Sequence, residues 1–220
     1  MNETLGAQVL AHLRSQLITG MLSPGDKLSL RSLALQQGVS IQPVREAVAR
    51  LVAERALEVA PKRSVRVPLM SLPQFRELTA IRLAIEGFAA EQAARRRGGG
   101  EGPLLRRFDA AFRRECRRRA PDFDAAIRAN AGLHFAAYRA AGMPALIAII
   151  EGLWLRIGPV LNLDLRSGEN RLASGVAARS HAAMVAAIER GDARAARAAL
   201  REDIGSTAAY IETRGVLPPE

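Results

Sequence analysis

The chain lacks most of what secreted, membrane-bound or disulfide-linked proteins need. Cys116 is its single cysteine, so no internal disulfide can form. The longest hydrophobic run, residues 143–155, is interrupted by Glu151 and is too short to span a bilayer. The first residues lack a basic segment followed by an apolar stretch, which is the pattern of a secretion signal. We therefore expect a soluble, cytoplasmic protein with no membrane partner.

The single thiol lies within a run of arginines, residues 113–119. Neighbouring guanidinium groups can lower the pKa of a thiol and make it a redox sensor. The other interpretation, which we favour, is an incidental thiol on a solvated helix face.

The charge of the chain is strongly positive. Among 220 residues, 32 are Lys or Arg and 22 are Asp or Glu, so the formal net charge is +10. Such a balance favours polyanionic partners but does not set the fold. Nine basic and five acidic residues fall in residues 1–68, so this part carries +4 and the remainder +6. Charge alone therefore does not locate a binding surface. A hydrophobic content of 49% allows a core in one large domain or two modest ones.

Two short helices joined by a tight turn are predicted in the first third of the chain. Leu30, Leu33 and Ala34 recur at helical spacing, and Gly38 can adopt the left-handed backbone that ends a helix. Ser40 can cap the next helix, because its hydroxyl can accept a hydrogen bond from the amide two residues on. The arrangement is a helix-turn-helix, which places its second helix in the major groove of DNA.

The second of these helices has an apolar side and a polar side. Pro43 fits its first turn, because proline has no amide hydrogen that would remain unpaired there. The residues expected in the core are Val44, Ala47, Val48 and Leu51. Those expected to face the groove are Ile41, Gln42, Arg45 and Ala49.

A preceding helix and a following hairpin complete a winged helix-turn-helix. Residues 57–59 and 65–67 alternate like two short strands, and the turn between them would carry Lys62 and Arg63 at the tip of the wing. An amphipathic helix with an apolar residue at every fourth position comes first: Leu5, Val9, Leu13 and Leu17. We expect residues 1–70 to form a DNA-binding domain.

The composition changes beyond the prolines at positions 68 and 73, to alanine, leucine and arginine in long helical periods. We place the domain boundary near Met70, so the second domain covers residues 71–220. No strand pattern occurs there, which predicts an all-helical bundle of six or seven antiparallel helices and a mainly α protein. The predicted helices cover residues 74–97, 103–119, 122–141, 144–163, 169–190 and 192–213.

Both predicted domains carry residues that resemble one family. In the first domain these residues are Leu22-Ser23-Pro24-Gly25-Asp26-Lys27-Leu28, Leu33-Ala34, Gly38-Val39-Ser40 and Pro43-Val44-Arg45-Glu46-Ala47. In the second domain they are Arg82-Leu83-Ala84-Ile85-Glu86, His134-Phe135, His181 and Gly191-Asp192. On these residues the chain resembles the GntR family of bacterial transcription regulators, in its FadR-type branch with a C-terminal FCD ligand-binding domain. The likeness runs from about Val9 to about Ile204.

The resemblance implies a homodimer that binds a short palindromic operator in double-stranded DNA. It also implies a small carboxylate metabolite bound in each helical domain, which changes the affinity for DNA. Family members most often repress transcription and are released by the effector. We therefore expect a sequence-specific transcriptional regulator of the repressor type.

The resemblance further implies an operator surface. Arg31 and Arg45 match family residues that contact bases and phosphates. A third family arginine, directly after the cap residue, is replaced here by Ile41, which can offer only apolar contact, for example to a thymine methyl. The expected DNA-binding residues are Arg31, Ser40, Ile41, Gln42, Arg45, Lys62 and Arg63.

The exchange at position 41 predicts an operator that differs from the family's usual guanine-containing half-site, with Gln42 reading an adenine. Loss of one bidentate arginine contact removes roughly 1 to 3 kcal/mol of discrimination at that base pair. In the alternative interpretation, Ile41 packs against the helix that begins near Leu30, and Gln42 touches only phosphate.

Many relatives hold a divalent metal through an aspartate, a histidine one turn later and two further histidines. The matching positions are Asn130, His134, His181 and Asp203. Two imidazoles and a carboxylate suit Zn, Ni, Mn or Fe and leave room for a ligand carboxylate, whereas the amide of Asn130 is a weaker donor. Alternatively, His134 and His181 hydrogen-bond inside a polar pocket without metal, with Asp203 fixing one tautomer.

Arg82 is the expected partner of the effector carboxylate, because in relatives an arginine at this position points toward the pocket. Its apolar neighbours Ile81, Leu83 and Ile85 favour this interpretation. The alternative is a helix pair between Arg82 and Glu86 on an exposed face, worth roughly 0.3 kcal/mol. The expected effector-binding residues are Arg82, Asn130, His134, Arg156 and His181.

Two other functions stay open. A metal held by two histidines and a carboxylate could activate water, as in a hydrolase. No separate general base or nucleophile occurs at a recognisable spacing, so we assign no catalytic residue and expect no enzyme. A basic architectural protein would coat DNA without sequence preference, but it gives no reason for inward-facing His134 and His181.

Overall fold

The computed structural model describes residues 4–60, 64–166 and 171–219, and for residues 162–166 and 171 the backbone alone. The predicted wing-tip residues Lys62 and Arg63 therefore lie outside the described residues. The chain divides into two compact units. One consists of Met1–Met70 and Trp154–Leu163, and the other of Ser71–Leu153 and Asp164–Glu220.

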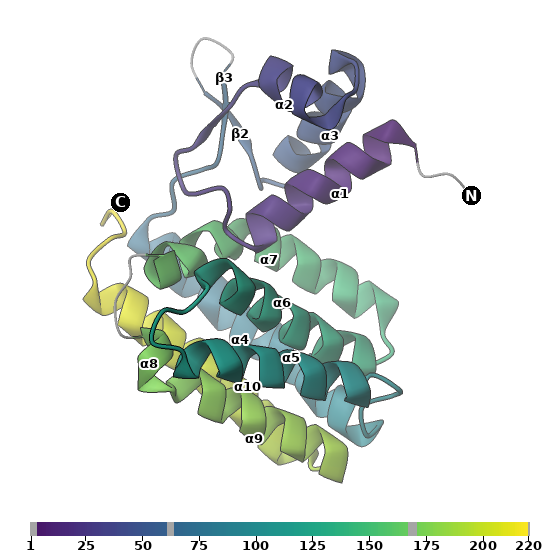
Figure 1. Cartoon of the computed structure of the whole chain (residues 1–220), viewed down its shortest axis with the longest axis vertical. Coiled ribbons are helices and arrows are strands. Elements are labelled where there is room, and N and C mark those ends of the chain that lie inside the picture. Colours follow the sequence, from purple (N-terminus) through teal and green to yellow (C-terminus); the bar gives the residue numbers. More distant parts are fainter. Residues whose placement is uncertain (1–3, 61–63, 167–170, 220) are drawn as a thin grey trace. The chain divides into compact units, whose positions relative to one another are not determined.

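The amino-terminal unit contains the helix-turn-helix and a small sheet (Figure 1). Its elements, apart from the Trp154–Leu163 segment, are α1 (Leu5–Ile18), β1 (Lys27–Leu28), α2 (Leu30–Gln37), α3 (Ile41–Ala53), β2 (Glu58–Ala60) and β3 (Ser64–Arg66). β3 lies between β1 and β2 and is antiparallel to both. This is the predicted winged helix-turn-helix. The alternation pattern does not predict β1, because a strand of two residues is too short to show a period.

The core of this unit confirms the predicted apolar side of α3. Val44 and Leu51 are fully buried, as are Leu13 and Leu17 of α1. Gly38 ends α2 in the left-handed conformation, with φ 64° and ψ 31°. The helix α2 therefore ends at the glycine that the sequence predicts.

The prediction that the Ser40 hydroxyl caps α3 is wrong. Ser40 occupies the capping position, but its side chain makes no capping hydrogen bond in the described part of the chain. At the other capped helices the amide three residues after the cap donates, as Ala7 does to Thr4 and Ser32 does to Ser29. At α3 that position is Pro43, which has no amide hydrogen to donate.

The second unit is helical throughout its described elements. These are α4 (Leu72–Arg95), α5 (Gly102–Arg117), α6 (Phe123–Ala140), the first part of α7 (Pro144–Arg166), α8 (Arg171–Ser174), α9 (Val176–Arg190) and α10 (Ala193–Thr213). α4 begins at a capping box, in which Ser71 and Gln74 each bond the backbone of the other. Each of α6 and α10 begins at an aspartate that accepts from the amide three residues on.

One predicted helix of this unit is two. The sequence pattern predicts a continuous helix over residues 169–190, whereas α8 and α9 are separated at Gly175. Gly175 has a φ of 65° and ψ of 9°, which breaks the right-handed helix at little steric cost for glycine. The apolar period continues across the break, so periodicity alone does not reveal it.

The helices of the second unit pack in close pairs. α10 lies against α4 and α9, α6 lies against α5 and α4, and α9 also contacts α5 (Figure 1). Small residues allow these approaches: a methyl group at Gly132 of α6 would lie 2.5 Å from the ring of Phe108 on α5. The close packing brings polar residues of α4, α6, α9 and α10 into one buried region.

The helix α7 is long and apolar enough to cross a membrane by length and composition alone. Its window Pro144–Leu161 has a mean hydropathy of 1.6 and is longer than the hydrophobic run of residues 143–155, which alone is too short to span a bilayer. A buried core helix meets the same criterion, and 44% of this window is buried within the protein. The feature is weak evidence for a membrane.

The environment of Cys116 favours the incidental thiol. The predicted solvated face is wrong, because Cys116 is half-buried on α5 and packs against a core cluster that includes Phe112 and Leu172. Burial raises the pKa of its thiol, and the nearby Arg117 guanidinium opposes this shift without overcoming it. A raised pKa leaves little of the reactive thiolate at neutral pH.

Candidate effector site and nucleic-acid interface

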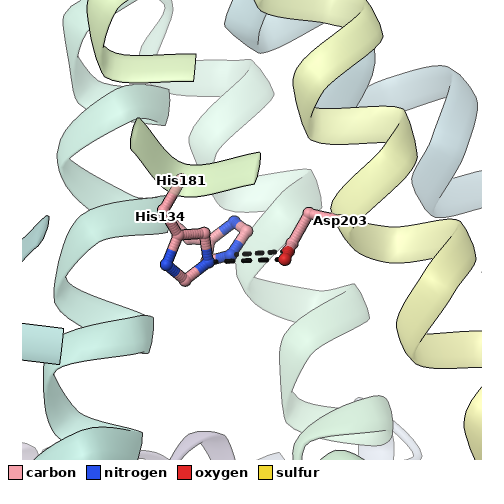
Figure 2. Close-up of side chains that lie close together, drawn as sticks. All are labelled: His134, His181 and Asp203. Atoms are coloured by element: carbon pink, nitrogen blue, oxygen red, sulfur yellow. Dashed lines mark ion pairs between the residues drawn. The ribbon is translucent and has the colours of Figure 1, made fainter. Parts of the chain in front are cut away.

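Three helices of the second unit bring His134, His181 and Asp203 together (Figure 2). His134 comes from α6, His181 from α9 and Asp203 from α10. The Nε2 atom of His134 lies 3.2 Å from Oδ2 of Asp203, and Nε2 of His181 lies 3.5 Å from Oδ1. One ligand atom from each residue lies within 4.8 Å of the other two. We call these three residues the His–Asp cluster.

The His–Asp cluster is buried, and its carboxylate, Asp203, is the acidic member. All three residues are less than a tenth exposed. Burial opposes the charge of Asp203, yet the pKa of its carboxyl is lowered, because His181 and His134 lie beside it. Asp203 is therefore ionised at neutral pH and attracts a cation.

The atoms of the cluster fit a divalent metal. Both ring nitrogens of His181 are buried and have no hydrogen-bond partner in the described part of the chain. An unpaired buried polar group costs about 1 to 3 kcal/mol, which a bound ligand can recover. The ring of Phe112 packs against His181, with centroids 4.7 Å apart, and limits its movement. Two imidazoles and one carboxylate form a donor set for Zn, Ni, Mn or Fe.

A second set of buried polar residues adjoins His134. Tyr138, one turn later on α6, has its hydroxyl 3.0 Å from Nδ1 of His134 and donates a hydrogen bond to Glu86 of α4. Glu86 in turn accepts from Nε and Nη2 of Arg82, at 2.6 and 3.1 Å. A continuous chain of polar contacts thus leads from Arg82 through Glu86 and Tyr138 to the His–Asp cluster.

The predicted environment of Arg82 needs correction. Arg82 is 3% exposed and Glu86 is fully buried, so their pair exists but is not the exposed pair of the alternative interpretation. The neighbour Ile81 is 39% exposed and does not belong to the buried side of α4. With 3.6 residues per turn, the buried side instead includes Leu78, Arg82 and Glu86. The apolar neighbours of Arg82 are therefore the wrong signal for an inward-pointing side chain.

The other predicted effector and metal residues are not part of the His–Asp cluster. Asn130 lies one turn before His134 on α6 and is half-buried. Arg156 falls in the segment Trp154–Leu163, which belongs to the amino-terminal unit, so the structure does not place it with the His–Asp cluster. The roles of Asn130, Arg82 and Arg156 in effector binding stay predictions.

Sequence reasoning did not single out Tyr138. Its position four residues after His134 on one helix places the two side chains on the same face, which is a usable signal. Glu86 entered only as a partner of Arg82, because its link to α6 depends on the packing of α4 against α6. Side-chain contacts of this kind arise between helices and leave no spacing rule in the sequence.

The helix-turn-helix exposes the basic residues that the resemblance assigns to DNA. Arg31 of α2 and Arg45 of α3 are both exposed. Gln42 is exposed as well and donates a hydrogen bond of 3.1 Å to Glu46, one turn later. The start of α3, where Ser40 makes no cap bond, leaves first-turn amides open to a phosphate.

Ile41 is half-buried but does not belong to the partly buried apolar residues that pack on the core of the amino-terminal unit. Those residues are Leu10, Ile18, Leu22, Leu30, Leu33, Val39 and Val52. This environment favours the groove-facing interpretation of Ile41 over packing against α2.

A winged helix-turn-helix joined to a helical domain with a buried ligand-type cluster defines a class of protein, the two-domain regulator with one DNA-binding and one ligand-sensing part. Comparison with known proteins agrees. Residues 5–67 match the model of bacterial regulatory proteins of the gntR family, and residues 77–206 match the FCD domain.

Individual relatives extend the match over most of the chain. The HTH-type transcriptional regulator McbR of Escherichia coli K12 is 36% identical over 163 residues, 72% of this chain and 71% of McbR. The HTH-type transcriptional repressor GlaR of the same organism is 28% identical over 66% of this chain and 71% of GlaR. The solved structure of E. coli McbR/YncC aligns with a TM-score of 0.88 and 30% identity, covering 97% of this chain and 100% of that chain.

The chain belongs to the gntR family of bacterial regulatory proteins and carries an FCD domain. It is a transcriptional regulator and not an enzyme. DNA binding through the amino-terminal unit and effector binding through the FCD domain are the functions of this domain pair.

Proposed function

We propose that this protein is a cytoplasmic homodimeric repressor that binds a palindromic operator and is released by a small carboxylate metabolite. The metabolite would bind in the FCD domain at a divalent metal held by the His–Asp cluster, with Asn130 as a further weak donor. The observation that carries the proposal is the buried convergence of His134, His181 and Asp203 from three different helices.

The metal proposal depends on chemistry that these residues offer together. Asp203 supplies the negative charge, and His134 and His181 supply imidazole nitrogens on the same side of the carboxylate. When bound, the metal would supply a Lewis-acidic centre for a carboxylate oxygen of the effector. The protein supplies the burial, which strengthens electrostatic attraction by excluding water.

The buried charges favour an effector with one carboxylate. With neutral His134 and His181, the charges of Arg82, Glu86 and Asp203 sum to 1 − 1 − 1 = −1, and the buried carboxylate of Asp109 near His181 is offset by its ion pair with Arg113. A divalent cation changes this sum to +1, and one ligand carboxylate brings it to zero. Because an uncompensated buried charge is unfavourable, the neutral combination is the preferred one.

The operator proposal rests on the exposed face of the helix-turn-helix. Arg31 and Arg45 present guanidinium groups that can bond guanine or phosphate, and Ile41 presents an apolar surface suited to a thymine methyl. We propose that these residues read DNA together with Ser40 and Gln42. Lys62 and Arg63 of the wing complete the proposed surface.

The homodimer proposal has support from an exposed apolar face of α4. Ile81 and Phe88 are 39% and 37% exposed and lie seven positions apart, which is two turns along one side of the helix. A second copy of the chain would cover such a surface and would match the two halves of a palindrome. Light scattering at micromolar concentration tests the dimer directly.

Metal analysis and thermal shifts test the effector proposal. Protein purified without a histidine tag should hold about one equivalent of a divalent metal per chain, or should gain thermal stability on addition of Zn or Ni. A panel of monocarboxylic acids should then contain at least one that raises the melting temperature further and weakens operator binding. Absence of stoichiometric metal, together with no thermal response to Zn or Ni, would contradict the metal part.

A further inference from the structure

The hydroxyl of Tyr138 lies between two polar partners, the carboxylate of Glu86 on one side and Nδ1 of His134 on the other. We infer that Tyr138 is a positioning residue, which holds His134 in the tautomer with its hydrogen on Nδ1 and so presents the Nε2 lone pair to the metal. The inference rests on the proposed metal site and adds a residue to it.

The direction of each hydrogen bond follows from counting hydrogens. Glu86 forms a buried ion pair with Arg82, accepts from two of its nitrogens, and also accepts from the hydroxyl of Tyr138. A phenol hydroxyl has one hydrogen to donate, and Tyr138 donates it to Glu86. The oxygen of Tyr138 is left to accept from His134.

The acceptor at Tyr138 places the hydrogen of a neutral His134 ring on Nδ1. The Nε2 atom is then a lone pair, and it lies 3.2 Å from the charged Oδ2 atom of Asp203. With the hydrogen on Nδ1, the Nε2 lone pair and the carboxylate oxygen repel each other unless a metal cation or a second proton on the ring lies between them. The protein therefore builds, on the Nε2 side of His134, the environment that a metal ion satisfies.

The hydrogen bond that fixes the tautomer depends on a buried ion pair. Arg82 and Glu86 form a pair that is almost fully shielded from solvent, and Tyr138 links this pair to α6. Outer residues that bond the second nitrogen of a ligating histidine change metal affinity by about 10- to 100-fold when they are removed. This gives the Arg82–Glu86 pair a role in the ligand site that does not require either residue to touch the effector.

The test compares Tyr138→Phe with Tyr210→Phe in the full-length protein. Tyr210 is the second tyrosine of the chain and lies two turns from Asp203 on α10, so its variant controls for loss of a hydroxyl. Zn affinity is measured by competition with a chromogenic chelator, and the melting temperature of the metal-free proteins is measured beside it. We expect Zn binding about tenfold weaker or more for Tyr138→Phe and unchanged for Tyr210→Phe.

A spectroscopic readout tests the tautomer without any change to Tyr138. Two-bond ¹H–¹⁵N spectra of the Zn-loaded protein distinguish a hydrogen on Nδ1 from one on Nε2, and His134→Gln identifies the signal among the three histidines. The inference requires the hydrogen of His134 on Nδ1. A hydrogen on Nε2, or equal Zn affinity of wild type and Tyr138→Phe, overturns it and leaves the metal proposal intact. A wild-type protein that binds neither Zn nor Ni overturns both.

Discussion

The side chains of His134 and Asp203 meet at 3.2 Å, Nε2 to Oδ2, although one residue lies on α6 and the other on α10. The packing of α4 against both helices holds this relationship in place. The contact joins the polar chain that begins at Arg82 to the carboxylate that attracts a cation. Loss of the charge at this contact should therefore disrupt the whole site.

Replacement of Asp203 by asparagine should abolish the thermal response to metal. The asparagine would keep the shape of the side chain but lose the charge that draws a divalent ion into the cluster. The control is Glu202→Gln, which removes a neighbouring but exposed carboxylate of the same helix. Differential scanning calorimetry with and without Zn should show the shift in wild type and Glu202→Gln only. An equal shift in all three proteins would remove Asp203 from the site.

Replacement of Arg45 by alanine should weaken specific DNA binding by about 5- to 150-fold, because one guanidinium contact to a base is worth about 1 to 3 kcal/mol. The matched control is Arg50→Ala, which removes an exposed arginine from the last turn of the same helix. Fluorescence anisotropy on a selected operator duplex measures both. Equal losses in the two variants would indicate a general charge effect instead of base reading.

Replacement of Ile41 by arginine should change which operator is preferred. The new guanidinium can bond O6 and N7 of a guanine, so the variant should select the family's guanine-containing half-site from random DNA. The wild-type protein should select a different half-site. If both proteins return the same sequence, position 41 does not read the base.

Two glycine substitutions should change stability in opposite directions. Gly38→Ala should destabilise by about 1 kcal/mol, because position 38 has a φ of 64° and alanine is strained there. Gly205→Ala, inside α10, should stabilise by up to about 1 kcal/mol, because alanine favours a helix interior. A methyl group at either site meets no described atom within 4 Å, so only the backbone differs. Urea unfolding of the two variants measures the contrast.

The contribution of Glu115 to stability should depend on pH. The Asp122 amide donates to its carboxylate, and this bond and Arg114 lower the pKa of Glu115 although burial opposes the shift. A carboxyl with a lowered pKa stabilises the fold above its unfolded pKa, and this stabilisation is lost as the pH falls through the folded pKa. Glu115→Gln should therefore cost about 1.5 kcal/mol at pH 7 and much less near pH 3.

The exposed Glu77 of α4 provides the control for this pH dependence. Glu77→Gln should change the free energy of unfolding little at either pH. A loss for Glu115→Gln that is as large at pH 3 as at pH 7 would mean that the hydrogen bond to Asp122 is not the cause.

Sequence patterns predict the course of α3 well, because its buried residues recur at helical spacing: Val44, Ala47, Val48 and Leu51. They do not predict β1, because two residues show no alternation, or the break at Gly175, because the apolar period continues across it. The cap prediction at Ser40 is wrong because the usual donor position holds Pro43. Apolar periods therefore predict where most helices lie. They do not predict a helix break or a missing cap bond, which depends on one residue such as Gly175 or Pro43.

The sequence predicts the residues of the candidate site only through their resemblance to a family pattern. His134, His181 and Asp203 come from three helices and can be brought together only by resemblance, since no spacing joins them. The contact of Tyr138 with Glu86 depends on how α6 packs against α4, and the neighbours of Arg82 indicate the wrong side of α4 as buried. Contacts between helices depend on how the folded chain packs, and residue spacing in the sequence does not predict them.

The most direct test is the affinity of the full-length protein for a selected operator duplex against a random duplex, measured at roughly physiological salt with Zn, with and without a stabilising monocarboxylic acid. The account predicts at least about a thousandfold preference for the operator. It also predicts that the acid weakens operator binding by wild type but not by Asp203→Asn. Equal affinity for the two duplexes, whether or not the acid is present, would contradict it.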